Sequence, residues 1–123
     1  MNRRNQSDHD RMVTAAARHL VAKGFQEVKA DLPGFQQPDK IVWSGSGRGH
    51  IPDVTGWGSE FNLFEVETAD SINDQHTADQ WKLFAAFAGQ HGAVFWVVVP
   101  VGAAAAAGQR LKDLGISAKV WEL

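Results

Sequence analysis

The sequence contains no cysteine, which excludes several kinds of structure and chemistry. There can be no disulfide framework, no thiol nucleophile and no zinc–thiolate site. Long apolar runs are also missing, because the longest, from Ala93 to Val101, is far shorter than the ~20 residues that cross a membrane. The opening residues, MNRRNQSDHD, hold no apolar stretch of the kind that a secretory signal needs. We therefore expect no membrane segment and a cytoplasmic location.

An excess of charge of either sign is also missing. The chain has 12 Lys and Arg residues against 14 Asp and Glu residues, and its net charge is −2. This balance argues against a large basic surface but leaves room for a small basic patch. The phosphate-binding patterns GxxxxGK[ST] and GxGxxG do not occur, and neither does the serine pattern GxSxG. The sequence therefore predicts no nucleotide cofactor.

What is present is the composition of an ordinary folded domain. The chain has 123 residues, of which 44% are hydrophobic and 21% are charged. Both fractions are close to the average of globular proteins. A chain of this length can bury a hydrophobic core without disulfides or metals. No linker or internal repeat divides it, so residues 1–123 are expected to form a single domain.

The hydrophobic pattern predicts an alternation of helices and strands. Helices are expected at 10–23, 73–90 and 103–114. Gly24 and Gly115 follow the first and the third, and Gly89 and Gly92 lie at the end of the second. Strands are expected at 25–30, 51–57, 61–68, 93–99 and 117–123. The resulting order is α-β-β-β-α-β-α-β, with hairpins first and crossovers later. This order predicts an α/β fold with a mixed central sheet flanked by helices.

Three acidic residues fall on the expected hairpin in the middle of the chain. If Ser59 lies at the centre of the turn, Asp53 faces Glu65 across the strands with Cβ atoms ~5 Å apart. Glu67 lies two residues after Glu65 and shares its face of the sheet. The three carboxylates would then converge on one patch, although like charges that face each other destabilise a hairpin. A bound divalent cation, or protons held by a raised pKa, would offset this repulsion.

Ordinary surface charge on a solvated face is the alternative explanation of these acids. Two observations bear on it. The same face carries the apolar residues Phe61 and Leu63, which a fully solvated face would not favour. A slip of one residue in the register, however, would turn Asp53 to the other face. We favour a site at this position.

The segments Ile-Pro-Asp-Val at 51–54 and Phe-Glu-Val-Glu at 64–67 resemble the motif of the PD-(D/E)XK nuclease superfamily. In that family an Asp precedes an (Asp/Glu)-x-Lys pattern on the next strand. The order of elements from about Asp10 to Val99 is also similar to the family's core order. The resemblance implies a restriction endonuclease-like αβββαβ core with a C-terminal αβ extension. It implies Mg²⁺-dependent or Mn²⁺-dependent hydrolysis of DNA phosphodiesters, in repair, junction resolution, restriction or a mobile-element system.

The resemblance also implies roles for individual residues. Asp53 and Glu65 match the metal-ligand positions, and the backbone carbonyl of Val66 would be a further ligand. Glu67 stands where the family usually has lysine, and it would act as a general base or as a ligand to a second metal. Gln80 is similar to a glutamine that some members carry on the following helix, where it would position water or phosphate. Members of this size commonly act as dimers, so a homodimer is possible.

The missing lysine leaves a second function open. A lysine would orient the attacking water and offset the growing negative charge, and Glu67 cannot do the second of these. A catalytically silent module of the same fold, which binds nucleic acid or protein, is therefore the alternative. The net charge of −2 also favours it.

Three further residues are possible accessories to the site. Asp10 lies near the start of the first helix, where many family members place an additional acid, but an acid that complements the helix dipole is an equal alternative. His50 follows a Gly/Ser-rich segment and would contact a phosphate. His76 shares a helix face with Gln80, but it more often would be an ordinary surface histidine. Lys82 lies ~200° around the helix from Gln80, and is expected to be solvated or to contact a phosphate.

Overall fold

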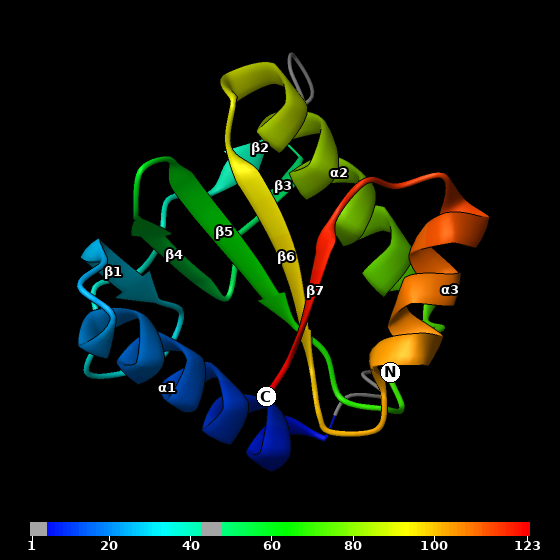
Figure 1. Cartoon of the computed structure of the whole chain (residues 1–123), viewed down its shortest axis with the longest axis horizontal. Helices are drawn as coiled ribbons and strands as arrows, with labels where there is room; N and C mark the ends of the chain where they lie inside the picture. The colour runs from blue at the N-terminus through cyan, green and yellow to red at the C-terminus, as the bar shows by residue number, and fades with distance from the viewer. Residues whose placement is uncertain (1–4, 43–47) are drawn as a thin grey trace.

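The chain folds into three helices and seven strands within the residues that the structure describes (Figure 1). This computed structural model describes residues 5–42 and 48–123. The helices are α1 (Gln6–Ala22), α2 (Gln75–His91) and α3 (Ala104–Leu114). The strands are β1 (Gln26–Ala30), β2 (Ile41–Val42), β3 (Gly49–His50), β4 (Val54–Trp57), β5 (Phe61–Val66), β6 (Val94–Val99) and β7 (Lys119–Glu122).

A five-stranded sheet with the order β1-β4-β5-β6-β7 forms the centre of the protein (Figure 1). β1, β4 and β5 pair antiparallel, as consecutive hairpin-type strands do. β6 and β7 continue the sheet parallel to β5, because each is reached through a crossover helix. The predicted α/β class, with a mixed sheet flanked by helices, is confirmed.

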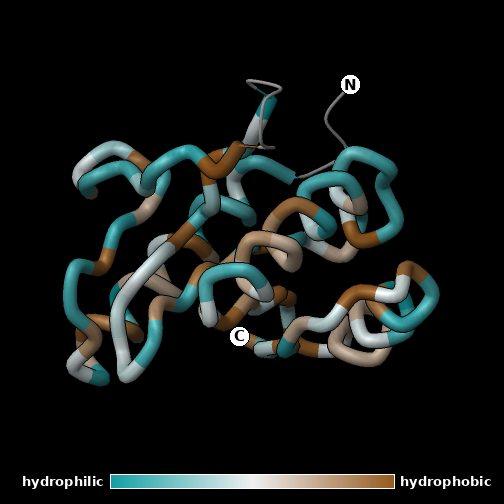
Figure 2. The backbone as a smooth tube through the Cα atoms, turned by 90° about the horizontal axis from the view of Figure 1, so that it is seen from above, coloured by the Kyte–Doolittle hydropathy of each residue, from teal (hydrophilic) through white to brown (hydrophobic). Residues whose placement is uncertain are grey.

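Two hydrophobic clusters lie on opposite faces of this sheet. α2 and α3 cover one face, where Leu63, Trp81 and Val97 are buried. α1 covers the other face, where Val13, Phe64 and neighbouring residues are buried. Hydrophilic stretches of the chain lie mainly at the periphery (Figure 2). None of the described helices is long and apolar enough to cross a membrane.

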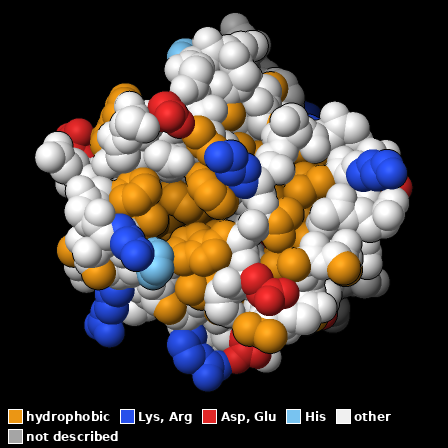
Figure 3. Space-filling view, viewed as in Figure 1, with side chains coloured by type: hydrophobic (Ala, Val, Ile, Leu, Met, Phe, Trp, Pro, Cys, Tyr) orange, Lys and Arg blue, Asp and Glu red, His pale blue; other side chains and the backbone are white. Residues whose placement is uncertain are grey.

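Helix α1 covers only part of its face of the sheet. It packs against β1, β4 and β5. Beyond it, the rings of Phe64 and Trp96 stack with their centroids 5.9 Å apart, and Trp96 remains partly exposed. Hydrophobic side chains are accordingly visible on this side of the molecule in Figure 3.

Helix α1 begins four residues earlier than the sequence analysis predicts. Asn5 caps it, since its side chain accepts a hydrogen bond from the backbone N–H of Asp8 at 3.1 Å. Asp8 is therefore the acid of the first turn, and Asp10 lies in the second. The helix dipole acts mainly within the first turn. The dipole explanation for Asp10 is thus wrong, and another partner must account for it.

The short β2–β3 pair was not predicted. Ile41 pairs with His50 and Val42 with Gly49. A Cβ atom on Gly49 would overlap the carbonyl oxygen of Ile41, so only glycine allows this approach of the two chains. Gly49 is the last residue of the Gly/Ser-rich segment that precedes His50. Residues 43–47, with the rest of that segment except Arg48, lie outside the described part of the chain.

Candidate active site

The β4–β5 hairpin has the predicted register. Val54 pairs with Phe64, and Trp57 with Phe61, so positions at equal distance from Ser59 face each other. Asp53 lies just before β4, and its backbone N–H donates to Glu65 Oε1 at 3.2 Å. Both acids are buried, with 6% of Asp53 and 1% of Glu65 exposed. The hairpin therefore brings these two residues together, as the turn arithmetic predicts.

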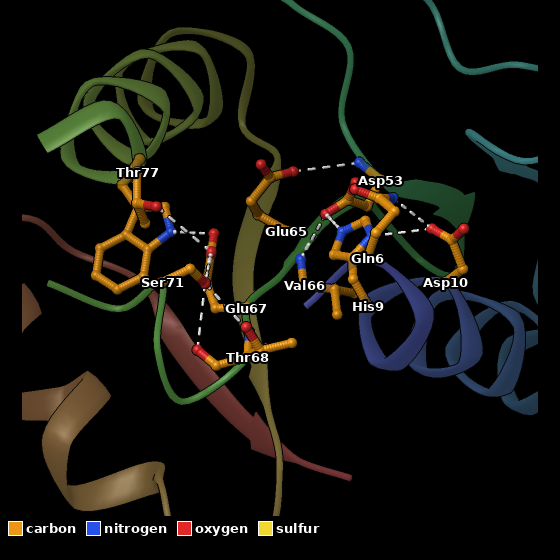
Figure 4. A network of polar contacts seen from close by, with 11 residues as sticks. Gln6, His9, Asp10, Asp53, Glu65, Val66, Glu67, Thr68, Ser71 and Thr77 are labelled. Carbon is orange, nitrogen blue, oxygen red and sulfur yellow. Dashed lines mark hydrogen bonds and ion pairs between the residues drawn. The ribbon is translucent and has the colours of Figure 1, made fainter. Parts of the chain in front are cut away.

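The carboxylate of Asp53 lies at the point where β4 and β5 separate. Its Oδ2 accepts a hydrogen bond from the backbone N–H of Val66 at 2.8 Å. This contact takes the place of a strand–strand hydrogen bond beyond the last residue pair. The same oxygen lies 3.1 Å from Nε2 of His9 on α1 (Figure 4). Asp53 thus joins both strands of the hairpin to the first helix.

His9 is buried between two acidic side chains. Its Nε2 faces Asp53 Oδ2 at 3.1 Å, and its Nδ1 faces Asp10 Oδ1 at 3.2 Å. Ionised carboxylates only accept hydrogen bonds. For both contacts to be hydrogen bonds at the same time, each ring nitrogen must carry a proton. An imidazole ring with two N–H groups is a cation. Asp10 also accepts from Gln6 at 2.8 Å, and it reaches the site through His9.

The sequence analysis missed His9. The predicted helix began at Asp10, and His9 has no metal-ligand spacing to another histidine. A signal was present nevertheless, since His9 lies four residues before Val13 and seven before Ala16, both buried. It therefore continues the buried stripe of α1 by one turn. A polar residue on such a stripe needs a polar partner inside the protein.

Glu67 is fully buried, and its carboxylate points away from the Asp53 carboxylate (Figure 4). Three neutral donors reach it. Ser71 Oγ donates at 2.6 Å, Trp81 Nε1 at 3.2 Å and Thr77 Oγ1 at 3.5 Å. Glu67 therefore ties the end of β5 to the following loop and to α2. Asp74, and not Ser71, is the N-cap of α2.

The three carboxylates do not converge as the sequence analysis expects. In residues 5–42 and 48–123, no three His, Asp or Glu side chains form a group that could hold a metal ion. The cause is the position of Glu67, which lies one residue after β5 ends. There the chain enters a loop, and the hydroxyl groups of Ser71 in this loop and of Thr77 in α2 donate hydrogen bonds to the carboxylate. Asp53 and Glu65 remain as a pair.

Gln80 is buried on α2, and its Oε1 has no hydrogen-bond partner in the described parts of the chain. A buried acceptor without a partner is uncommon in folded proteins and calls for an explanation. His76 and Phe84 lie one turn before and one turn after it. Both rings contact His50, with centroids 5.4 Å and 6.3 Å away. Gln80 thus lies on the face of α2 that is turned toward β3.

The packing of α2 against β5 indicates which turn of the helix lies opposite Glu65. At one end of β5, Phe61 packs on Phe87 with ring centroids 6.4 Å apart. At the other end, Glu67 contacts Thr77 and Trp81. α2 therefore runs antiparallel to β5, and Glu65 lies between these two contacts on the same face of the strand. We infer that Glu65 faces the turn of α2 that carries Gln80 and Trp81.

The predicted accessory residues His50 and His76 meet in an edge-to-face contact. Both line an open hollow of about 630 Å³ between β3 and the first half of α2. The described residues around this hollow are mostly basic. They are Lys40, Arg48, Gly49, His50, His76, Asp79 and Lys82, and we call this site the basic hollow.

The position of His50 predicts a pH effect on stability. Burial lowers its pKa from the ordinary 6.5, and so do His76 and Lys40, while Asp79 opposes them. The unfolded chain then takes up a proton at a higher pH than the folded protein. The free energy of unfolding is therefore expected to fall as the pH drops through 6.5 toward the lowered pKa of folded His50. Urea unfolding between about pH 7.5 and 5.5 measures this slope.

The variant His50→Gln is the control for this effect. It removes the titrating ring and is expected to show a shallower fall in stability over the same pH range. An equal slope in both proteins would assign the effect to other groups.

Comparisons with known proteins assign neither a family nor a function to this chain. No family model matches the sequence, and no curated protein matches it. Among solved structures, the fold is similar to a chain of the EndoMS-dsDNA2 complex, with a TM-score of 0.43 and 15% sequence identity. The match covers 89% of this chain and 44% of the other, so this chain spans less than half of that protein's length. We draw no argument from so distant a likeness.

Proposed function

We propose that the protein is a metal-dependent nuclease that hydrolyses DNA phosphodiesters. The observation that carries this proposal is the buried pair of Asp53 and Glu65, joined through the Asp53 N–H at the end of the β4–β5 hairpin. Removing carboxylates from water is unfavourable unless a cation or several donors compensate for it. Two carboxylates buried side by side therefore indicate a functional role, such as binding a cation.

The residues present fit a hard divalent cation. Asp53 and Glu65 would hold Mg²⁺ or Mn²⁺ together with the backbone carbonyl of Val66, and all three supply oxygen donors. Such an ion polarises a phosphoryl oxygen and lowers the pKa of an attacking water. The unpartnered Gln80 Oε1 gives independent support, since an acceptor facing Glu65 would accept a proton of that water.

Other residues of the site would position these groups. The Val66 N–H and the His9 ring hold the Asp53 carboxylate in one orientation. A carboxylate that already accepts from three donors is poorly placed to take a proton from water. We therefore propose that Glu67 anchors α2 beside Glu65, rather than acting as general base or ligand to a second metal.

The arrangement supports membership of the PD-(D/E)XK superfamily. Asp53 and the Glu65-x-Glu67 segment lie at the end of the central hairpin, and a helix and a parallel strand follow. This is the order that the superfamily's restriction endonuclease-like core implies. We infer that DNA is the substrate, and we keep the homodimer as an expectation, to be tested by sedimentation of the purified protein.

A catalytically silent module of the same fold is the second candidate. Two observations favour it: the hydrogen bonds that engage Glu67, and the finding that no group of three metal-binding side chains occurs in the described residues. This module would bind nucleic acid or protein through the same face without cleaving anything.

Metal titration separates the two candidates. We expect Mg²⁺ or Mn²⁺ to raise the thermal midpoint of the wild type and not that of Glu65→Gln. Saturation at ~100 times the dissociation constant stabilises by about 2.7 kcal/mol. The matched control is Glu60→Gln in the exposed turn of the same hairpin, which should respond as the wild type does.

Cleavage assays complete this test. Wild type with metal should cut branched or linear DNA, and Asp53→Asn should lose at least two orders of magnitude in rate. If the wild type shows neither a metal-dependent midpoint nor cleavage up to ~10 mM metal, the nuclease proposal fails and the silent module stands.

A further inference from the structure

Charge is distributed unequally around the Asp53–Glu65 pair. On the side of β3 and α2, the basic hollow holds three fixed cations, Lys40, Arg48 and Lys82, and two histidines. On the side of α1, Asp8 forms an ion pair with Arg11, and Asp10 contacts the buried ring of His9. A polyanion that approaches the acid pair is therefore attracted most strongly from the side of the basic hollow.

The basic hollow lies next to the proposed active site. His50 precedes Asp53 by three residues. Its ring contacts His76 and Phe84, the two residues that flank Gln80 on α2. The α2 turn that faces Glu65 therefore also forms a wall of the hollow. A phosphate bound in the basic hollow and a phosphodiester at the acid pair can therefore belong to neighbouring positions of one polymer strand.

The lysines of the hollow are available to a ligand. Neither Lys40 nor Lys82 forms an ion pair with any residue in the described parts of the chain, and both are exposed. Asp79, the acid of the hollow, accepts a hydrogen bond from Gln75 at 3.0 Å. Lys40 and Lys82 alone outnumber the one carboxylate of the hollow, in a protein whose net charge is −2.

We propose that the basic hollow binds backbone phosphates of the DNA strand that enters the Asp53–Glu65 pair, so that the strand passes over the hollow between β3 and α2. This inference rests on the proposed nuclease function, and it adds the path by which the DNA strand reaches the acid pair. Lys40 and Lys82 neutralise phosphate charge, and a ring N–H of His50 and of His76 can donate a hydrogen bond to a phosphate oxygen. Contacts of this kind fix the position of a strand and carry no sequence preference.

Salt dependence of DNA binding tests the proposal. Binding of a fluorescent DNA duplex is measured in EDTA, so that no metal-dependent cleavage occurs, at a series of salt concentrations. Each phosphate contact contributes about −0.9 to the slope of log affinity against log salt. We expect the double variant Lys40→Ala/Lys82→Ala to lose nearly two of these increments and to bind at least tenfold more weakly at ~0.1 M salt.

A control with the same change of charge accompanies it. Lys23 ends α1 and Lys112 lies in the last turn of α3, and both are exposed and away from the hollow. Lys23→Ala/Lys112→Ala should keep the wild-type slope. Equal slopes in the two double variants would overturn the proposal, because only the total charge would then matter.

Two further readouts separate failure of this inference from failure of the proposed function. In proton NMR spectra, the imidazole signals of His50 and His76 should shift on DNA addition, while that of His91 should not. If the wild type cleaves DNA but these signals stay fixed, the path is wrong and the nuclease stands. If the wild type neither binds nor cleaves DNA, both proposals fall.

Discussion

The substitution Glu67→Lys, which completes the usual nuclease motif on paper, is expected to unfold much of the protein. Position 67 is fully buried, and Ser71, Thr77 and Trp81 all direct donors at it. An ammonium group there offers further donors to groups that need an acceptor. A buried charge that lacks a compensating partner costs about 3–5 kcal/mol. This is a large part of the ~5–15 kcal/mol that stabilises an ordinary domain.

The comparison with Glu67→Gln isolates the charge from the shape. Glutamine keeps the size and one acceptor oxygen, but turns its amide toward one of the donors. It is expected to cost only about 1–2 kcal/mol, the value of one lost hydrogen bond with its desolvation. Urea unfolding of the three proteins measures the difference. A folded Glu67→Lys variant that cleaves DNA better than the wild type would contradict the structural role of Glu67. It would show that position 67 belongs to the catalytic site.

The substitution Asp53→Ala is expected to be the second most destabilising. Asp53 Oδ2 is the acceptor for the Val66 N–H and the neighbour of His9 Nε2, and all three groups are buried. Alanine leaves one backbone donor and one ring nitrogen without this partner. Each buried group left unsatisfied costs about 1–3 kcal/mol. We therefore expect a loss of about 2–6 kcal/mol in the free energy of unfolding.

The variant Asp53→Asn separates this structural role from the proposed catalytic one. Asparagine can place its Oδ1 where Asp53 Oδ2 lies, and this one oxygen then accepts from the Val66 N–H and from a protonated Nε2 of His9. It should cost about 1 kcal/mol, yet it removes the charge that a metal requires. Both variants should lose metal-dependent cleavage, while only Asp53→Ala loses much stability. Equal stability of the two would show that the contacts of Oδ2 contribute little.

The local parts of the site could be predicted from the sequence. A hairpin register depends on the turn and on residues a few positions away, so Asp53 and Glu65 could be matched by counting from Ser59. The predicted ends of helices were less accurate, since the Asn5 cap of α1 was not recognised.

The partners of the acidic side chains were decided by the tertiary structure. His9 and Asp53 are 44 positions apart, and their contact requires α1 to pack over the end of the hairpin. The direction of the Glu67 side chain depends on which donors α2 brings to it from Thr77 and Trp81. Sequence patterns reveal the period and the polarity of a segment, and they do not reveal the rotation and offset with which two elements pack. The sequence therefore determined the class of fold, the hairpin and the acids on it. Packing alone decided that Asp53 meets His9, that Glu67 is turned to α2, and that His50 and His76 face each other beside Gln80.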